Sequence, residues 1–144
     1  MRFIVLAFFL TAVPLSAQAQ PRPGATHALA GNWAFETDAA TERRCTITGE
    51  ATLTPARPDN YTVRLSTLEQ CASGETWRSL QDCTAVHSQG SLRLSCTIVR
   101  VQPSNYAPDD FALRVVSADA MQGELVSTWN APARWRRTRP DLVS

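Results

Sequence analysis

Four cysteines and two histidines are the side chains of this sequence best suited to metal binding or redox chemistry. No two cysteines are separated by only two residues, and His27 and His87 fall in an expected tail and an expected turn. Structural zinc sites and redox-active thiol pairs typically have such close spacing. We therefore expect no metal site and no redox-active pair among Cys45, Cys71, Cys83 and Cys96.

Motifs that accompany common enzyme mechanisms are also missing. The sequence contains no G-x-S-x-G elbow, and its 6 glycines are scattered singly rather than gathered in a phosphate-binding loop. Asp109-Asp110 is the only adjacent pair of acids, and we interpret it as a turn and strand entry because it follows Pro108 and precedes an apolar alternation. We expect no catalytic residues, no cofactor and no enzyme activity.

Residues 1–19 have the organisation of a signal peptide. Arg2 precedes an apolar run from Phe3 to Leu15, and Ala17-Gln18-Ala19 fits the small-x-small rule for signal peptidase. The apolar run is shorter than the ~20 residues that a membrane-spanning helix needs. We therefore expect cleavage before Gln20, no membrane span, and a periplasmic or secreted protein.

The charge of the chain provides no general attraction for nucleic acid. Its 14 basic residues are all arginines and stand against 13 acids, so loss of Arg2 with the signal peptide leaves a net charge near zero. Four arginines near the C-terminus are interpreted as the exposed face of a last strand: Arg134, Arg136, Arg137 and Arg139. We expect a small molecule or a protein as partner, and no nucleic acid.

Alternation of apolar and polar residues, typical of half-buried β-strands, recurs along the chain after residue 28. In the stretch 45–54 the even positions are almost all threonine, whereas the odd positions carry cysteine or small and apolar residues. Turn-forming residues punctuate these stretches. We expect strands near residues 33–37, 45–54, 61–71, 76–86, 92–99, 111–115, 121–129 and around Trp135.

Short connections between these strands favour antiparallel pairing of neighbours, which is a meander. We predict an all-β fold, an eight-stranded antiparallel up-and-down barrel, because closure removes both exposed edges. A two-sheet sandwich is the alternative. The expected organisation is a signal peptide at 1–19, an extended arm at 20–28, the barrel at 29–138 and a tail at 139–144.

Four cysteines in an exported chain predict two disulfides. The midpoint of the first two cysteines falls at position 58 and that of the last two between positions 89 and 90, both inside expected turns. Opposed residues of a hairpin lie ~4.5–5.5 Å apart at Cα, within disulfide range. We predict Cys45–Cys71 and Cys83–Cys96; the alternative bridges Cys71 to Cys83 and Cys45 to Cys96.

The barrel interior is the best candidate for a binding site. An eight-stranded barrel is just wide enough to be filled by side chains or to hold one small ligand. The large inward residues more often make a packed core than a pocket, whereas small inward residues such as Gly49 and Gly123 leave room for a cavity. The candidate ligand-binding residues are Trp33, Phe35, Tyr61, Leu65, Trp77, Phe111, Met121 and Trp129.

Gly31-Asn32-Trp33 at the start of the first strand, together with Arg137 in the last, resembles the lipocalin superfamily. In that family the tryptophan of a G-x-W motif plugs the closed end of the barrel, and an arginine near the C-terminus packs across it. The resemblance implies a lipocalin-like (calycin-type) barrel that Gly31, Trp33 and Arg137 close at one end. It also implies an interior that binds a small ligand.

The N-terminal half also resembles the small periplasmic inhibitors of serralysin-type metalloproteases. The shared residues are Leu29-Ala30-Gly31-x-Trp33, Cys45-x-Ile47, Cys71 and Trp77. This resemblance implies a lipocalin-like barrel with a Cys45–Cys71 disulfide. It further implies that the residues ahead of the barrel, here Gln20 to Thr26, enter the protease cleft.

The layout of the whole mature chain resembles small secreted proteins of alphaproteobacteria, through Tyr106 to Phe111 and Met121-Gln122-Gly123. No function comes with that resemblance. Our hypothesis from the sequence is an exported, non-enzymatic lipocalin-like barrel that binds a small apolar ligand or a protein partner, such as a secreted protease. The alternative is a periplasmic inhibitor of secreted metalloproteases that acts through its N-terminal arm.

Overall fold

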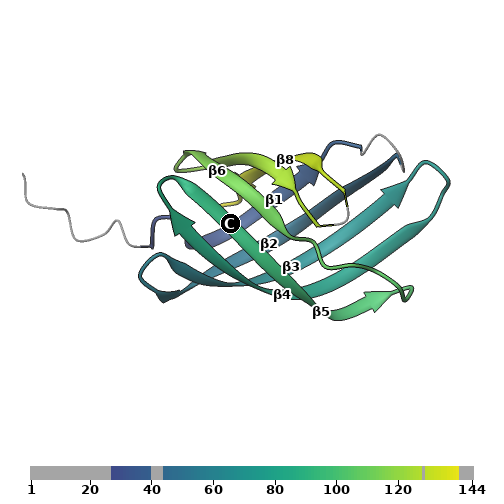
Figure 1. The fold of residues 1–144 in the computed structure, drawn as a ribbon, viewed down its shortest axis with the longest axis horizontal. Coiled ribbons are helices and arrows are strands. Elements are labelled where there is room, and N and C mark those ends of the chain that lie inside the picture. Colours follow the sequence, from purple (N-terminus) through teal and green to yellow (C-terminus); the bar gives the residue numbers. More distant parts are fainter. Residues whose placement is uncertain (1–26, 40–43, 128, 140–144) are drawn as a thin grey trace, which may run out of the picture.

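A computed structural model describes residues 27–39, 44–127 and 129–139, which form one closed antiparallel β-barrel (Figure 1). Its strands are β1 (Gly31–Thr37), β2 (Cys45–Arg57), β3 (Asn60–Cys71), β4 (Thr76–Ser88), β5 (Ser91–Gln102), β6 (Phe111–Ser117), β7 (Ala120–Leu125) and β8 (Ala131–Arg137). Each strand pairs with its sequence neighbours, and β1 pairs with β8. The predicted all-β barrel is confirmed, while the predicted signal peptide and most of the arm lie outside the described residues.

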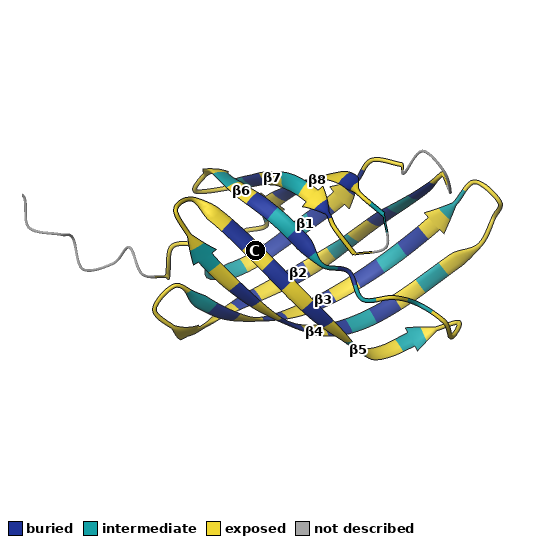
Figure 2. Cartoon of the chain, viewed as in Figure 1, coloured by how far each residue is buried: buried dark blue, intermediate teal, exposed yellow. Residues whose placement is uncertain are grey.

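Alternating burial along the strands explains why the sheet closes around one core. On β3, Tyr61, Val63 and Leu65 are buried, and the residues between them are exposed. Figure 2 shows the same alternation as dark and yellow bands along the ribbons. Closing the sheet therefore removes the apolar stripe of every strand from water and leaves the polar stripe outside.

Both disulfides lie within hairpins, as predicted. Cys45 and Cys71 are opposed on β2 and β3, with Cα atoms 3.9 Å apart. Cys83 and Cys96 are opposed on β4 and β5, with Cα atoms 4.0 Å apart. The hairpin turns fall at the sequence midpoints of the two pairs, so the alternative pairing of Cys71 with Cys83 is excluded.

Several strand ends differ from the expectation, most clearly those of β2 and β7. β2 continues through Pro55 to Arg57, with a register shift against β3, because a bulge lets a strand contain a proline. β7 ends at Leu125, so Ser127 and Trp129 lie in the β7–β8 connection rather than in a strand. The β5–β6 and β7–β8 connections lie at the end of the barrel where β7 ends, and both are longer than the turns at the other end.

The pairing between β5 and β6 is short. Only residues 91–94 of β5 pair with β6, whereas residues 91–102 pair with β4. Beyond Leu94 the β5–β6 connection returns toward the barrel, where Asp110 Oδ1 accepts a hydrogen bond of 2.7 Å from the Cys96 amide. This contact ties the connection to β5, and the adjacent Asp109 side chain is buried.

Three aromatic rings pack the middle of the barrel. Phe35 stacks on Trp135 with ring centroids 4.7 Å apart, and Phe111 meets both rings edge-on at 5.2 Å. A Cβ atom at Gly49 would lie 2.6 Å from two carbons of the Phe35 ring. The glycine that left room for a cavity in the sequence therefore makes room for Phe35.

Gly49→Ala is expected to lower the free energy of unfolding by about 2 kcal/mol, because overpacking a dense core costs about 1–3 kcal/mol. The added methyl group would meet the Phe35 ring and the Ser66 carbonyl oxygen. Urea denaturation measures the loss. Combining Gly49→Ala with Phe35→Leu should cost less than the sum of the two single changes, since the smaller side chain leaves space. An unchanged urea midpoint in Gly49→Ala would contradict the packing described.

Candidate binding site

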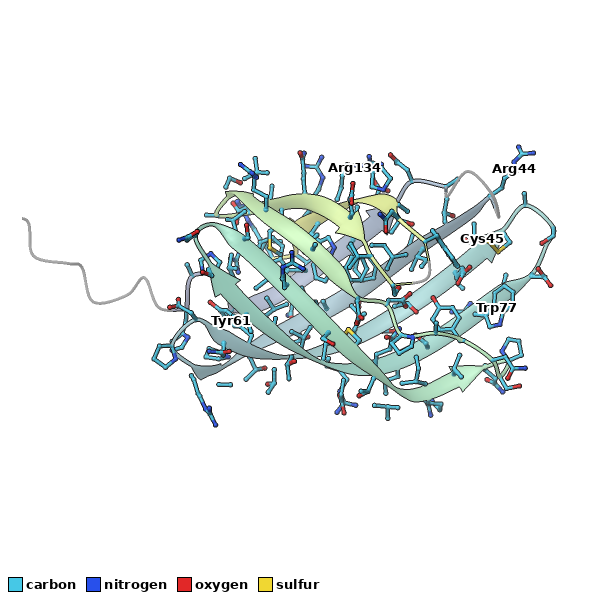
Figure 3. All side chains as sticks on the ribbon, in the orientation of Figure 1. Arg44, Cys45, Tyr61, Trp77 and Arg134 are labelled. Carbon is cyan, nitrogen blue, oxygen red and sulfur yellow. A yellow bond between two sulfur atoms is a disulfide. The ribbon has the colours of Figure 1, made fainter. Side chains whose placement is uncertain are left out.

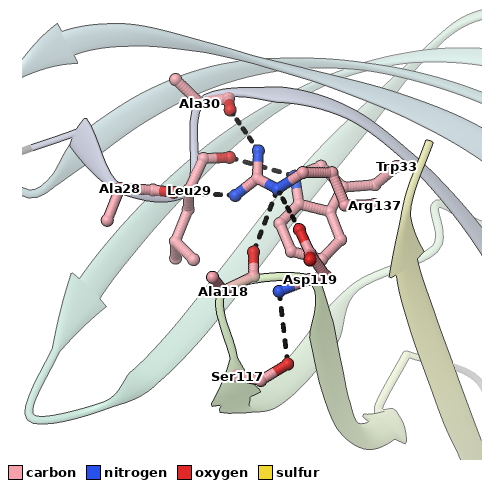
Figure 4. A network of polar contacts seen from close by, with 8 residues as sticks. All are labelled: Ala28, Leu29, Ala30, Trp33, Ser117, Ala118, Asp119 and Arg137. Atoms are coloured by element: carbon pink, nitrogen blue, oxygen red, sulfur yellow. Dashed lines mark hydrogen bonds and ion pairs between the residues drawn. The ribbon is translucent and has the colours of Figure 1, made fainter. Parts of the chain in front are cut away.

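Trp33 and Arg137 fill one end of the barrel (Figure 4). Trp33 is fully buried, and its Nε1 donates a hydrogen bond of 3.0 Å to the Leu29 carbonyl oxygen. The Arg137 guanidinium carbon lies 4.5 Å from the centroid of the Trp33 ring, within range of a cation–π attraction. We call this end the closed end.

Arg137 also joins separate segments of the chain at the closed end. Its guanidinium donates to the carbonyl oxygens of Ala28 and Ala30 at 2.8 and 2.6 Å. It also donates to the Ala118 carbonyl oxygen at 3.0 Å and pairs with Asp119 at 3.3 Å. One side chain therefore links the start of the barrel, the β6–β7 turn and β8.

Gly31 allows the arginine to approach the backbone. Its φ of +123° favours glycine, and a Cβ atom there would lie 3.0 Å from Arg137 Nη1. The structure thus brings together Gly31, Trp33 and Arg137, the three residues that the lipocalin resemblance placed at the closed end.

The candidate interior residues divide into two groups. Six of them are at most 4% exposed and belong to the packed core: Trp33, Phe35, Tyr61, Leu65, Phe111 and Met121. The other two, Trp77 and Trp129, are half-buried. Tyr61 lies at the closed end, where its hydroxyl accepts a hydrogen bond of 3.4 Å from the Leu29 amide, and Figure 3 shows Trp77 at the opposite end of the barrel.

A pocket of about 150 Å³ lies at this opposite end, and we call it the open-end pocket. Its lining comes from the ends of β3, β4 and β7 and from the two connections 103–110 and 126–130. The lining residues are Glu69, Trp77, Asn105, Tyr106, Ala107, Asp109, Leu125, Ser127 and Trp129. Aromatic rings from three segments therefore border one space.

A network of buried polar side chains holds Asp109 beside this pocket. Asp109 Oδ2 accepts a hydrogen bond of 2.5 Å from Gln81 Nε2, and the Asp109 amide donates to Gln81 Oε1 at 2.9 Å. Gln81 also donates to Ser79 Oγ at 2.7 Å, and Ser79 shares a 2.6 Å hydrogen bond with Thr67 Oγ1. The Tyr106 hydroxyl donates to the Asp109 carboxylate at 3.0 and 3.1 Å. The carboxyl of Asp109 is therefore oriented from two sides.

Burial controls the protonation of Asp109. Removal of its carboxylate from water raises the pKa of Asp109 to about 7; the negative charge of Glu69 adds to the rise, and hydrogen bonds from Gln81 and Tyr106 oppose it. Burial and the charge of Asp109 raise the pKa of the Tyr106 hydroxyl far above its usual range. Tyr106 therefore stays a proton donor, while Asp109 changes charge near neutral pH.

Glu69 adds a second buried carboxyl to the open-end pocket. It is 2% exposed, and its Oε1 lies 3.7 Å from Cys71 Sγ. Cys45, Glu69 and Cys71 are close enough together to hold a metal ion. Both sulfur atoms belong to the disulfide, however, so they offer no thiolate ligand. We assign no metal site to this cluster.

Sequence patterning missed the polar part of the open-end pocket. Thr67, Glu69, Ser79 and Gln81 occupy the same alternating positions as the buried apolar residues of β3 and β4. Polar residues at inward positions on adjacent strands are the signal that could have found them. Asp109 precedes β6, as expected of a strand entry, but its buried side chain gave no sign in the sequence because a connection has no periodicity.

Two larger hollows, of about 650 Å³ each, are lined mainly by side chains on the outer face of the barrel. One lies over β5 to β8 and includes Arg93, Arg114 and Arg134. The other lies over β2 to β5 and is rich in threonine. Neither combines buried carboxyls with aromatic rings, so the open-end pocket is the better candidate.

Comparison with known proteins supports the fold and identifies no family. No protein-family model and no curated protein matches this chain. Among solved structures, the chain is similar to one described as the de novo design of a fluorescence-activating β-barrel. The TM-score is 0.57 at 19% sequence identity, covering 79% of this chain and 97% of that chain. At this identity the similarity shows a shared barrel fold alone.

Proposed function

We propose that this chain is an exported, non-enzymatic binding protein that holds a small molecule in the open-end pocket. The observation that carries the proposal is a pocket with aromatic walls and buried polar groups at one end of a barrel that is packed in the middle and plugged at the other end. Pockets that bind small molecules combine apolar walls with a few polar groups that fix the orientation of the ligand.

The size of the pocket limits the ligand. Cavities of ~150 Å³ in protein cores hold benzene, so the open-end pocket suits a ligand portion of about one ring. Its lining combines Trp77 and Trp129 with Glu69 and Asp109. We therefore narrow the expected apolar ligand to one with a small apolar body and a polar group.

Export to an oxidising compartment is part of the proposal. The two disulfides fit such a compartment, whereas thiols in the cytosol are kept reduced. Within the described residues, no helix is long and apolar enough to cross a membrane. The signal peptide and a periplasmic or secreted location rest on the sequence, because residues 1–19 lie outside the described part of the chain.

Inhibition of a secreted metalloprotease is the second candidate function. The Cys45–Cys71 disulfide is the one that the resemblance to those inhibitors implies. Arg137 binds the Ala28 carbonyl oxygen, so the arm joins the barrel at the closed end, away from the open-end pocket. The two functions would use different ends of the molecule. Loss of protease inhibition after removal of residues 20–28 would favour this second function.

Ligand binding in the open-end pocket is expected to perturb two of the 4 tryptophan indole signals. Single-ring fragments that carry a polar group should shift the Nε1–H resonances of Trp77 and Trp129 in ¹H–¹⁵N spectra. The resonances of Trp33 and Trp135 should stay in place, because both side chains are buried in the core. Fragments that shift no indole signal, or that shift only residues of the outer face, would contradict the proposal.

A pair of alanine substitutions provides the control for this experiment. Ala107→Leu adds volume at the lining of the open-end pocket and should weaken the binding of every fragment. Ala56→Leu adds the same volume at an exposed position near the β2–β3 turn and should leave binding unchanged. Equal binding in both variants would place the ligand elsewhere.

A further inference from the structure

We infer that the open-end pocket selects small organic cations, such as protonated primary amines attached to a ring-sized apolar body. The inference rests on the proposed small-molecule function and names the class of ligand. It follows from the joint presence of two buried carboxyls and three aromatic rings around one pocket.

The two carboxyls give the pocket its charge. Glu69 on β3 and Asp109 in the β5–β6 connection are 2% and 3% exposed, and both line the pocket. No lysine, arginine or histidine occurs among its described lining residues. A cation that enters gains attraction to carboxylates that are shielded from water, and an anion meets repulsion there.

Three aromatic side chains supply the remaining recognition surface. Trp77 comes from β4, and Tyr106 and Trp129 come from the two connections at this end. An ammonium group within about 6 Å of a ring centroid is attracted to the face of the ring, most strongly for tryptophan. The same rings can bury the apolar body of an amine. A neutral apolar ligand would gain only this second contribution.

A metal ion fits this lining less well than an amine. Calcium and magnesium prefer about six or more oxygen ligands. Much of the pocket wall is aromatic or aliphatic, and the Asp109 carboxylate already accepts hydrogen bonds from Gln81 and Tyr106. A carboxylate has about four acceptor sites and a primary ammonium has three donors, so Asp109 can accept a further hydrogen bond from an ammonium group beside those from Gln81 and Tyr106. The chemistry of the lining therefore favours an organic cation.

The pH dependence of binding gives a test that needs no mutation. Asp109 ionises near pH 7, and a bound cation stabilises its ionised form, so the affinity for an amine should rise from about pH 6 to about pH 8. The groups that face Asp109 are Glu69 and Thr67 from β3, Gln81 from β4 and Tyr106 from its own connection. Tyr106 stays protonated throughout this range. A neutral ligand should show no such rise.

Three probes with the same ring-sized body separate charge from shape: 2-phenylethylammonium, 2-phenylethanol and phenylacetate. Calorimetric titration of the mature protein at about pH 8 should give an affinity for the ammonium ion about ten-fold or more above that for the alcohol, since hydrogen bonds to charged groups outweigh neutral ones by that order. Phenylacetate should bind more weakly than either.

Matched variants connect this preference to Asp109. Asp109→Asn should lower the affinity for 2-phenylethylammonium about ten-fold more than it lowers the affinity for 2-phenylethanol, and it should remove the rise in amine affinity between about pH 6 and about pH 8. Asp82→Asn removes the same charge from an exposed position on the outer face of β4 and should change neither affinity more than about two-fold. If Asp109→Asn does not fold, the pH series on the wild-type protein still decides the question.

Each outcome separates the cation inference from the proposed function. Equal affinities for the ammonium ion and the alcohol would overturn the cation inference and leave small-molecule binding intact. The same holds if none of the three probes binds while other single-ring fragments still shift Trp77 and Trp129. Failure of every fragment would overturn both.

Discussion

Asp109→Asn is expected to remove a loss of stability that the wild-type protein undergoes between about pH 4 and about pH 7. Burial raises the pKa of Asp109 from its usual 3.8 to about 7 in the folded protein. Between these values the folded state keeps a proton that the unfolded state has released, so stability falls as the pH rises. The difference between the two pKa values corresponds to at most about 4 kcal/mol of unfolding free energy. Asp109→Asn should be more stable than wild type by up to this amount at neutral pH, because asparagine does not ionise.

Urea denaturation at a series of pH values measures this effect. Asp82→Asn is the control, because it removes the same carboxylate from an exposed position, where Asp82 pairs with Arg64 at 2.9 Å. Asp38 acts in the opposite direction: a hydrogen bond from Arg134 lowers its pKa, so its contribution is lost only as the pH falls below about 4. Equal slopes in wild type and Asp109→Asn would contradict the buried, protonated state of Asp109.

The registers of the β2–β3 and β4–β5 hairpins could be predicted because the cysteines are placed symmetrically about their two turns. Partners in a hairpin are equidistant from its turn, and both cysteine pairs are opposed as this symmetry requires. Strand ends were harder to predict. Pro55 is typical of a turn, yet a register shift accommodates it within β2. Local residue preference cannot anticipate a bulge that pairing with the neighbouring strand stabilises.

The filling of the interior could not be predicted from single strands. Gly49 leaves space on β2, but Phe35 lies directly opposite it on β1 and takes that space. Glu69 and Gln81 have the parity of buried residues, yet only the three-dimensional neighbourhood shows that both are inside the barrel. Asp109 lies in a connection, and its contact with Gln81 joins positions 28 residues apart. The polar side chains of the open-end pocket therefore come together only in the folded structure, and no single strand indicates them.

Arg137→Met is expected to lower the free energy of unfolding by about 3 kcal/mol. Methionine retains apolar contact with Trp33 but cannot donate hydrogen bonds. The part-buried Ala30 carbonyl would lose its donor, whereas the more exposed Ala28 and Ala118 carbonyls regain water. A hydrogen bond from a charged donor contributes about 1.5–3 kcal/mol, so the loss should be near that of one or two such bonds. Urea denaturation followed by tryptophan fluorescence measures it.

Two further variants separate geometry from charge at the closed end. Arg137→Lys keeps a cation near Trp33 but lacks the planar fork that reaches several carbonyl groups, so we expect about half of the loss. Arg136→Met changes an exposed neighbour and should cost less than about 0.5 kcal/mol. Hydrogen exchange at Trp33 Nε1–H should become faster in Arg137→Met, while exchange at Trp77 and Trp129 stays at its wild-type rate. That result would show that the two ends open independently, as required if a ligand enters only at the open-end pocket. Faster exchange at all three indoles would instead show that Arg137 stabilises the whole barrel.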